Sequence, residues 1–241
     1  MLLGTSVFAA DVNKYKAVPL KAGKTVTQKD SDYAYKNGNY TYTHYRYQIK
    51  VPADGYLTMT VKKGKSIYST RSLTMYESLS SNENTCYWYK NDVKSAAFKI
   101  PVSKGTYYFT IHEKETLSYK FTKVTHKANY CRAKAAALKK KAKVTICQTP
   151  QYNFTRWYKL TLTKKQAITY WINQLDNYDV TLEISLYNSK MKRISVEHAG
   201  SESPKYFTSE KQDKGTYYLC VRAQRDGGYI YNHRLLSLYW S

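Results

Sequence analysis

The stretch Gly105-Thr106-Tyr107-Tyr108-Phe109-Thr110-Ile111 decides the fold of this chain, because a version of it returns later. The second version, Gly215-Thr216-Tyr217-Tyr218-Leu219-Cys220-Val221, lies 110 residues further on. In both stretches large apolar side chains fill every second position, the period of a β-strand with one buried face. Each follows a Lys-Gly turn signal. The pattern predicts short strands joined by tight turns.

Other blocks of the chain repeat in the same order. Tyr47–Val51 matches Tyr158–Leu162 at an offset of 111. The same offset of 111 pairs Leu57, Met59, Val61, Leu73, Met75 and Tyr76 with Ile168, Tyr170, Ile172, Ile184, Leu186 and Tyr187. Further upstream, Leu20 and Val26 match Leu138 and Val144 at an offset of 118. The change of offset places seven additional residues within 30–44, where we expect a longer loop or an extended hairpin.

These repeats predict an all-β protein of two tandem antiparallel β-sandwich domains. A chain of 241 residues also suits two domains of ordinary size. We expect the first domain over residues 11–126 and the second over 127–241. Residues 127–143 form a basic linker and the first strand of the second domain. Their alanine run, Ala133–Leu138, could form one or two helical turns.

Residues 1–10 form an apolar run that ends in small residues, as the end of a secretory signal peptide does. We interpret them as the remnant of such a signal, with an ordinary first strand as the alternative. No other apolar run approaches the length of about 18–20 residues that a transmembrane helix needs. The sequence therefore predicts a secreted or cell-wall-associated protein without a membrane span.

The chain is strongly basic, with 39 Lys and Arg against 17 Asp and Glu and a net charge of +22. Both halves carry the excess, so it is a property of the whole surface. Such a surface attracts polyanions, or it serves only to keep the protein soluble. Most of the basic residues are Lys, which lacks the planar fork of Arg, so we expect no specific nucleic-acid recognition. An anionic cell-wall polymer or glycan is the expected partner.

The order of the repeated blocks resembles the bacterial pre-peptidase C-terminal domain. The motifs that carry the resemblance are Trp157–Leu160, Ser185–Asn188 and Lys214–Tyr218, with Tyr45–Tyr47, Thr74–Tyr76 and Lys104–Tyr108 in the first copy. The resemblance implies a jelly-roll β-sandwich and an accessory role beside an enzyme or on a cell surface. Some members of that family bind calcium or fibrous protein. This chain lacks the clustered carboxylates of a calcium site.

Signals for catalysis are poor. The five histidines form no metal-ligand spacing, and neither a nucleophile elbow nor a phosphate-binding loop is present. The cysteines Cys86, Cys131, Cys147 and Cys220 allow three disulfide pairings or remain thiols. Cys220 lies on the outward phase of its strand, where the first copy has Thr110. We expect no enzyme activity, cofactor or metal.

Clustered aromatic residues are the best sign of a binding site. The candidate ligand-binding residues are Tyr33, Tyr35, Tyr40, Tyr42, Tyr87, Trp88 and Tyr89. Exposed rings at a sandwich edge could stack on sugars, although they could equally pack on the sheet. The sequence thus favours a non-catalytic binding or adhesion module for cell-wall polymer or glycan. The alternatives are a structural spacer without a ligand and a charge-driven binder of polyanions such as nucleic acid.

Overall fold

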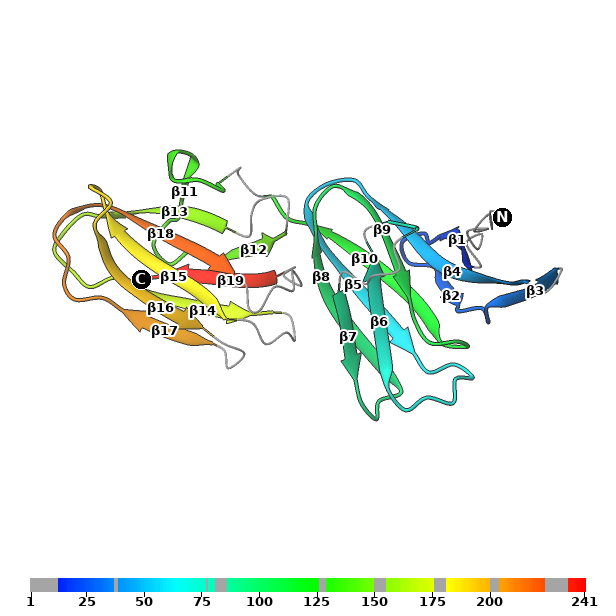
Figure 1. Ribbon diagram of the computed structural model, residues 1–241. Coiled ribbons are helices and arrows are strands. Elements are labelled where there is room, and N and C mark those ends of the chain that lie inside the picture. The colour runs from blue at the N-terminus through cyan, green and yellow to red at the C-terminus, as the bar shows by residue number, and fades with distance from the viewer. Residues whose placement is uncertain are drawn as a thin grey trace, which may run out of the picture. The chain divides into compact units, whose positions relative to one another are not determined.

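The computed structural model describes residues 13–36, 39–76, 78–80, 86–125, 129–149, 155–175, 181–199, 204–223 and 234–241. Regular structure in these ranges is β-strand, apart from the short 3-10 helix η1 (Arg132–Lys134) (Figure 1). The expected signal remnant at 1–10 and the domain boundary at 126–127 include residues outside these ranges, and both stay predictions. Within the described ranges no helix has the length and apolar character needed to cross a membrane.

Nineteen strands are defined in the described ranges. Those of the first half are β1 (Asn13–Pro19), β2 (Thr25–Thr27), β3 (Asp32–Lys36), β4 (Asn39–Val51), β5 (Gly55–Lys62), β6 (Arg71–Tyr76), β7 (Cys86–Lys90), β8 (Ser95–Val102), β9 (Gly105–Thr110) and β10 (Thr116–Lys123). Those of the second half are β11 (Ala136–Ala137), β12 (Val144–Gln148), β13 (Thr155–Leu162), β14 (Thr169–Gln174), β15 (Leu182–Asn188), β16 (Arg193–Ala199), β17 (Lys205–Thr208), β18 (Gly215–Ala223) and β19 (Arg234–Trp240).

The described strands form two pairs of sheets with the same strand order. In the first pair the orders are β1-β4-β9-β6-β7, with β3 attached to β4, and β2-β10-β5-β8. In the second pair they are β11-β13-β18-β15-β16 and β12-β19-β14-β17. Apart from β3, each strand of one pair has a counterpart at the same place in the other. The predicted all-β sandwich class is confirmed, and the eight strands β12–β19 follow the jelly-roll arrangement.

Backbone hydrogen bonds recur between matching strands and turns of the two sheet pairs. Leu20 N donates to Gln48 O at 2.9 Å, and Leu138 N donates to Lys159 O at 2.9 Å. The matching turns close in the same way, through Gly23 N to Tyr119 O at 2.9 Å and Lys141 N to Trp240 O at 2.8 Å. Both turn residues have positive φ, 73° at Gly23 and 62° at Lys141. Equivalent residues therefore make equivalent contacts in the two sheet pairs.

Two strands depart from the predicted antiparallel arrangement. β1 pairs with β4 in parallel over seven residues, and β11 pairs with β13 in parallel over two. The reason is the path of the chain, because β2 and β12 follow β1 and β11 in sequence but belong to the opposite sheets. The paired strands β1 and β4, and likewise β11 and β13, are therefore not consecutive in the chain, so no tight hairpin joins them and they can pair in parallel.

The additional residues of the first half form the hairpin of β3 and β4. Tyr33 and Tyr42 are register partners in this antiparallel pair, and so are Tyr35 and Tyr40. The expected extended hairpin is therefore present. The alanine run is not helical beyond η1, which ends at Lys134, because Ala136 and Ala137 pair with β13 as β11 instead. Pairing to a sheet edge outweighs the helix propensity of alanine here.

Packing divides the chain into two compact units. The first holds most of β1–β10, and the second holds β11–β19 together with residues 51–59 and 97–105. The second unit has a core of fully buried side chains from both of its sheets, among them Leu160, Ile172, Leu219 and Leu238. In the first half Phe109 is fully buried as well. Burial of such side chains is the main source of stability in both units.

Candidate functional site

The candidate site lies on the outer face of β14. This strand reads Thr169-Tyr170-Trp171-Ile172-Asn173-Gln174, and the side chains of Tyr170 and Ile172 belong to the core. Because side chains alternate along a strand, Trp171 points to the opposite face, where it is half-buried. The sheet thus presents a large indole ring on the face that does not pack in the sandwich.

Three aromatic rings form a row across neighbouring strands at Trp171. Its register partners are Tyr206 in β17 and Tyr239 in β19. The ring centroids of Trp171 and Tyr239 are 4.5 Å apart at an interplanar angle of 56°. Those of Trp171 and Tyr206 are 5.7 Å apart in an edge-to-face contact of 82°. We call this row the aromatic platform. Tyr206 is 63% exposed, and Trp171 and Tyr239 are half-buried, so solvent reaches all three rings.

Polar groups adjoin the aromatic platform one step along the strands. Asn173 and Ser237 are register partners in β14 and β19, on the same outer face as Trp171. Together with Lys143 and Pro204, they border a pocket of about 340 Å³ whose aromatic wall is Trp171 and Tyr239. The site therefore combines flat rings with an amide, a hydroxyl and an exposed ammonium group. These groups can donate or accept hydrogen bonds around a stacked ligand.

Packing on the inner face fixes the strands that carry the platform. The ring of Tyr170 contacts that of Phe207 with centroids 5.4 Å apart. Burial raises the pKa of Tyr170 above its usual value, so its hydroxyl stays protonated. At the start of β14, Thr169 and Thr208 share a hydrogen bond between hydroxyls at 3.1 Å. The platform is consequently built on ordered sheet rather than on loops, which favours a preformed site.

The first sheet pair has no counterpart of this platform. The offset of 111 places Thr60 of β5 where β14 has Trp171. Leu117 pairs with Val26 as Leu238 pairs with Val144, so Ser118 takes the place of Tyr239. The two positions that carry adjacent rings in the second unit thus carry small hydroxyl side chains in the first half. The platform is not a requirement of the shared fold.

The structure separates the aromatic residues that the sequence proposed as a binding site. Tyr87 and Tyr89 of β7 are exposed, with ring centroids 5.9 Å apart. Trp88 is only 5% exposed because it has the inward phase of the same strand, so its inclusion among ligand-contacting residues needs correction. Tyr42 is exposed, whereas the side chains of Tyr33, Tyr35 and Tyr40 lie outside the described part. Binding at the exposed tyrosines stays a prediction.

Sequence reasoning missed the aromatic platform, although part of its signal was present. The repeat matches Tyr170 and Ile172 to Met59 and Val61, and alternation along such a strand puts Trp171 on the opposite face. What the sequence lacks is the strand order that brings Tyr239 and Tyr206 beside it. These residues are 68 and 35 positions away from Trp171 in the chain.

The described residues offer little for catalysis. No three His, Cys, Asp or Glu side chains among them come together as a metal site would require. All four cysteines are described, and each is a thiol rather than half of a disulfide. Cys220 faces outward, yet it is 3% exposed, because it lies between Trp157 and Ser185 of the neighbouring strands. Burial raises the pKa of Cys220 to about 12, which makes it a poor nucleophile at neutral pH.

No protein-family model and no curated protein sequence matches the chain. In structure it is similar to the pre-peptidase C-terminal domain of collagenase from Bacillus anthracis, with 13% identity over 44% of this chain and 94% of that domain and a TM-score of 0.36. It is also similar to the PBSX exported protein XepA, with 9% identity over 92% of this chain and 83% of that one and a TM-score of 0.24. For the CUB1-EGF-CUB2 domains of human MASP-1/3 the identity is 9%, the coverage 90% and 99%, and the TM-score 0.26.

Proposed function

We propose that this chain is a non-catalytic module that binds a glycan on its aromatic platform. The observation that carries the proposal is the solvent-accessible row Tyr206–Trp171–Tyr239. In the first sheet pair Thr60 and Ser118 take the places of its adjacent rings Trp171 and Tyr239. Secretion or attachment to a cell surface is part of the same proposal, as the setting in which such a module would meet its ligand.

The chemistry of the site suits a sugar chain. A pyranose ring has apolar C–H groups on its faces and hydroxyl groups around its edge. The indole of Trp171 offers a flat surface for the C–H face, and an aromatic ring buries a large area at low entropic cost. Asn173 and Ser237 border the same pocket as Trp171 and would be the hydrogen-bond partners of hydroxyl groups at the sugar edge. Lys143 would add attraction to a carboxylate or phosphate on the same chain.

The repeated strand order supports the assignment of function to this face. We infer that the two sheet pairs descend from one duplicated module, with the boundary near residues 126–127. Features that both copies share are explained by the fold. Trp171 and Tyr239 are found in one copy alone, where Thr60 and Ser118 serve the fold equally well. A half-buried Trp on the outer face that the fold does not require is best explained by a ligand.

The test is a binding measurement on Trp171→Ala. Pull-down and affinity electrophoresis would use peptidoglycan sacculi, chitin and polygalacturonate as probes. We expect the variant to lose at least about tenfold in affinity for the probe that the wild type binds, in line with the loss of a stacked ring. Lys143→Ala should weaken binding only if that probe is anionic. Thermal unfolding of each variant checks that the sheet remains intact.

Two controls make the result decisive. Thr60→Ala changes the equivalent position of β5 and should leave binding unchanged. The double variant Tyr87→Ala/Tyr89→Ala tests the exposed tyrosines of β7. Loss of binding in that double variant, with Trp171→Ala unaffected, would move the site to the first half. No binding of any probe by the wild type would favour the spacer role.

A further inference from the structure

The loop between β5 and β6 exposes an aliphatic side chain to an unusual degree. Ile67 is 88% exposed and its neighbour Tyr68 is 46% exposed. A single exposed apolar residue is common on protein surfaces and means little alone. The surroundings of Ile67 decide whether it has a role.

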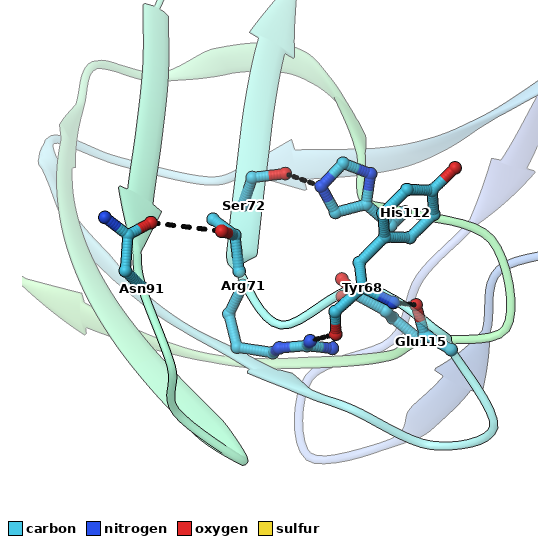
Figure 2. A network of polar contacts seen from close by, with 8 residues as sticks. Tyr68, Arg71, Ser72, Asn91, His112 and Glu115 are labelled. Carbon is cyan, nitrogen blue, oxygen red and sulfur yellow. Dashed lines mark hydrogen bonds and ion pairs between the residues drawn. The ribbon is translucent and has the colours of Figure 1, made fainter.

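Buried groups hold this loop in place (Figure 2). The guanidinium of Arg71, which has no exposed surface, donates a hydrogen bond to the carbonyl of Tyr68 and forms an ion pair with Glu115. The ring of Tyr68 stacks on His112 with centroids 4.3 Å apart and an interplanar angle of 25°. His112 in turn shares a hydrogen bond with Ser72 at 2.9 Å. The residue that follows Ile67 is therefore fixed through both its backbone and its side chain.

Further contacts fix the two ends of the loop. Thr70 donates a hydrogen bond to the Asn91 side chain at 3.0 Å. Near its start, Gly64 has a φ of 56°, and a Cβ atom there would lie 2.2 Å from the carbonyl oxygen of Lys114. Contacts hold the loop in place at both ends and at Tyr68. The exposure of Ile67 is therefore a consequence of a defined loop conformation.

Lysines are concentrated in this loop and in the segments bonded to it. Lys63 N donates to Lys94 O at 2.9 Å, and Lys65 N donates to Lys114 O at 3.1 Å, so three chain segments meet here. The exposed basic side chains that they contribute are Lys62, Lys63, Lys65, Lys94 and Lys114. The exposed acidic residues of the neighbouring segments are Asp30, which pairs with Lys114 at 3.7 Å, Asp92 and Glu113, whereas Glu115 is buried against Arg71. Positive charge prevails around Ile67.

We propose that this loop, with Ile67 at its tip and the lysines around it, docks on the surface of an anionic lipid bilayer. Ile67 would enter the boundary between headgroups and acyl chains, with the exposed edge of Tyr68 at headgroup level. The five lysines would lie among the lipid phosphates, where each basic residue adds attraction. A soluble polyanion offers no apolar phase, so it would make use of the lysines but not of Ile67. The combination favours a membrane.

The experiment is flotation with vesicles of phosphatidylcholine, with and without about 30% phosphatidylglycerol, at low and physiological salt. We expect the wild type to float with the anionic vesicles only. Ile67→Ser should reduce the bound fraction by about tenfold, because one buried aliphatic side chain is lost from the lipid. Ile67→Leu, which keeps an aliphatic side chain, should bind like the wild type. Lys63→Glu/Lys65→Glu should abolish it.

Matched variants show whether the effect belongs to Ile67 in particular. Val196→Ser removes an exposed aliphatic side chain from β16 and should float like the wild type. Trp171→Ala should also float like the wild type. The flotation result can therefore be interpreted even if the glycan proposal fails. In Ile67→Trp, the new indole fluorescence should shift to the blue when anionic vesicles are added.

Three outcomes would overturn the proposal. The first is the absence of flotation by the wild type at low salt. The second is equal flotation of the wild type and Ile67→Ser. The third is binding of polyphosphate or DNA that competes fully with vesicles and does not depend on Ile67, which would show a site for soluble polyanions instead.

Discussion

Arg71 and Glu115 form an ion pair in the first unit, although 44 residues separate them in the chain and neither side chain has any exposed surface. A carboxyl group without access to water favours its neutral form, and the Arg71 charge opposes this. Desolvation is the larger effect, so burial raises the pKa of Glu115 to about 7 from a usual value of 4.5. Glu115 therefore titrates within the physiological range and makes stability depend on pH.

The first prediction concerns Glu115→Gln. The carboxyl binds its proton more tightly in the folded state than in the unfolded state, so its contribution is present below about pH 4.5 and is lost as pH rises through about 7. The melting temperature of the wild type minus that of Glu115→Gln should therefore decrease from pH 4.5 to pH 7. Each pKa unit corresponds to about 1.4 kcal/mol. Thermal unfolding of both proteins across this pH range measures the difference in melting temperature.

His112 is the control for that experiment, because it acts in the opposite sense. Burial, assisted by the Arg71 charge, lowers the pKa of His112. Its contribution is present above about pH 6.5 and is lost as pH falls through its folded pKa. Glu115→Gln should retain this trend and become more stable as pH rises. A difference curve that stays flat from pH 4.5 to pH 7 would show that Glu115 keeps an ordinary pKa.

The second prediction compares two glycines with positive φ. Gly23 has no heavy atom within 4 Å of an added Cβ, so Gly23→Ala should cost only the backbone strain of about 1–2 kcal/mol. At Gly64 the added Cβ would meet the Lys114 carbonyl oxygen at 2.2 Å, and backbone must move. Gly64→Ala should therefore be the more destabilising of the two in urea unfolding. Equal losses of stability would show that the backbone at Gly64 and the backbone at Lys114 move apart at little cost.

Lys141 provides a third arm for the same comparison. It occupies the turn position that corresponds to Gly23, with a φ of 62° and a non-glycine side chain. Lys141→Gly should stabilise the second unit by about 1 kcal/mol, because the strain of a left-handed residue is removed. A loss of stability would mean that the Lys141 side chain contributes more than its backbone strain costs.

The third prediction concerns core packing. Phe109 and Leu219 occupy matching positions of β9 and β18, and both are fully buried. Phe109→Ala should cost about 3–5 kcal/mol and Leu219→Ala about 2–5 kcal/mol, through lost burial and the cavity left behind. Chemical unfolding monitored by circular dichroism would measure both. A loss below about 1 kcal/mol at Phe109 would be incompatible with its place in the core.

The fourth prediction concerns cysteine reactivity. Cys131 is partly exposed, whereas Cys86, Cys147 and Cys220 are buried. Under native conditions a thiol reagent should modify one equivalent quickly and the other three only on unfolding. Cys131→Ser should remove the fast phase, and Cys220→Ser should leave it unchanged. A total of fewer than four thiols in denaturant without reductant would show a disulfide.

Strand phase was the part of the structure that the sequence predicted well. Leu57, Met59 and Val61 alternate with polar residues, and all three are fully buried. The segment Tyr87–Tyr89 is conspicuous as a cluster of rings, but it is also a strand with two faces. Applied consistently, alternation would have placed the two tyrosines outside and the tryptophan inside.

The alternation of polar and apolar residues does not predict which charged side chains are buried. Arg46 lies on the outer phase of β4, between the buried Tyr45 and Tyr47, yet it is only 2% exposed. The rings of Tyr15 and Tyr76 cover its guanidinium, with centroids 3.7 and 3.6 Å away. Tyr15 belongs to β1 and Tyr76 to β6, so the contact depends on a sheet order that no local pattern encodes. The aromatic platform escaped prediction for the same reason.

The position of β19 has a consequence for the synthesis of the protein. This strand lies between β12 and β14, which precede it by roughly ninety and sixty residues in the chain. Until residues 234–240 have left the ribosome, β12 and β14 lack a common neighbour and each keeps an open edge. Open edges invite pairing with other chains. A translating ribosome that stalls before this point would therefore hold a nascent chain prone to aggregation, and a chaperone that covers those edges would have its greatest effect there.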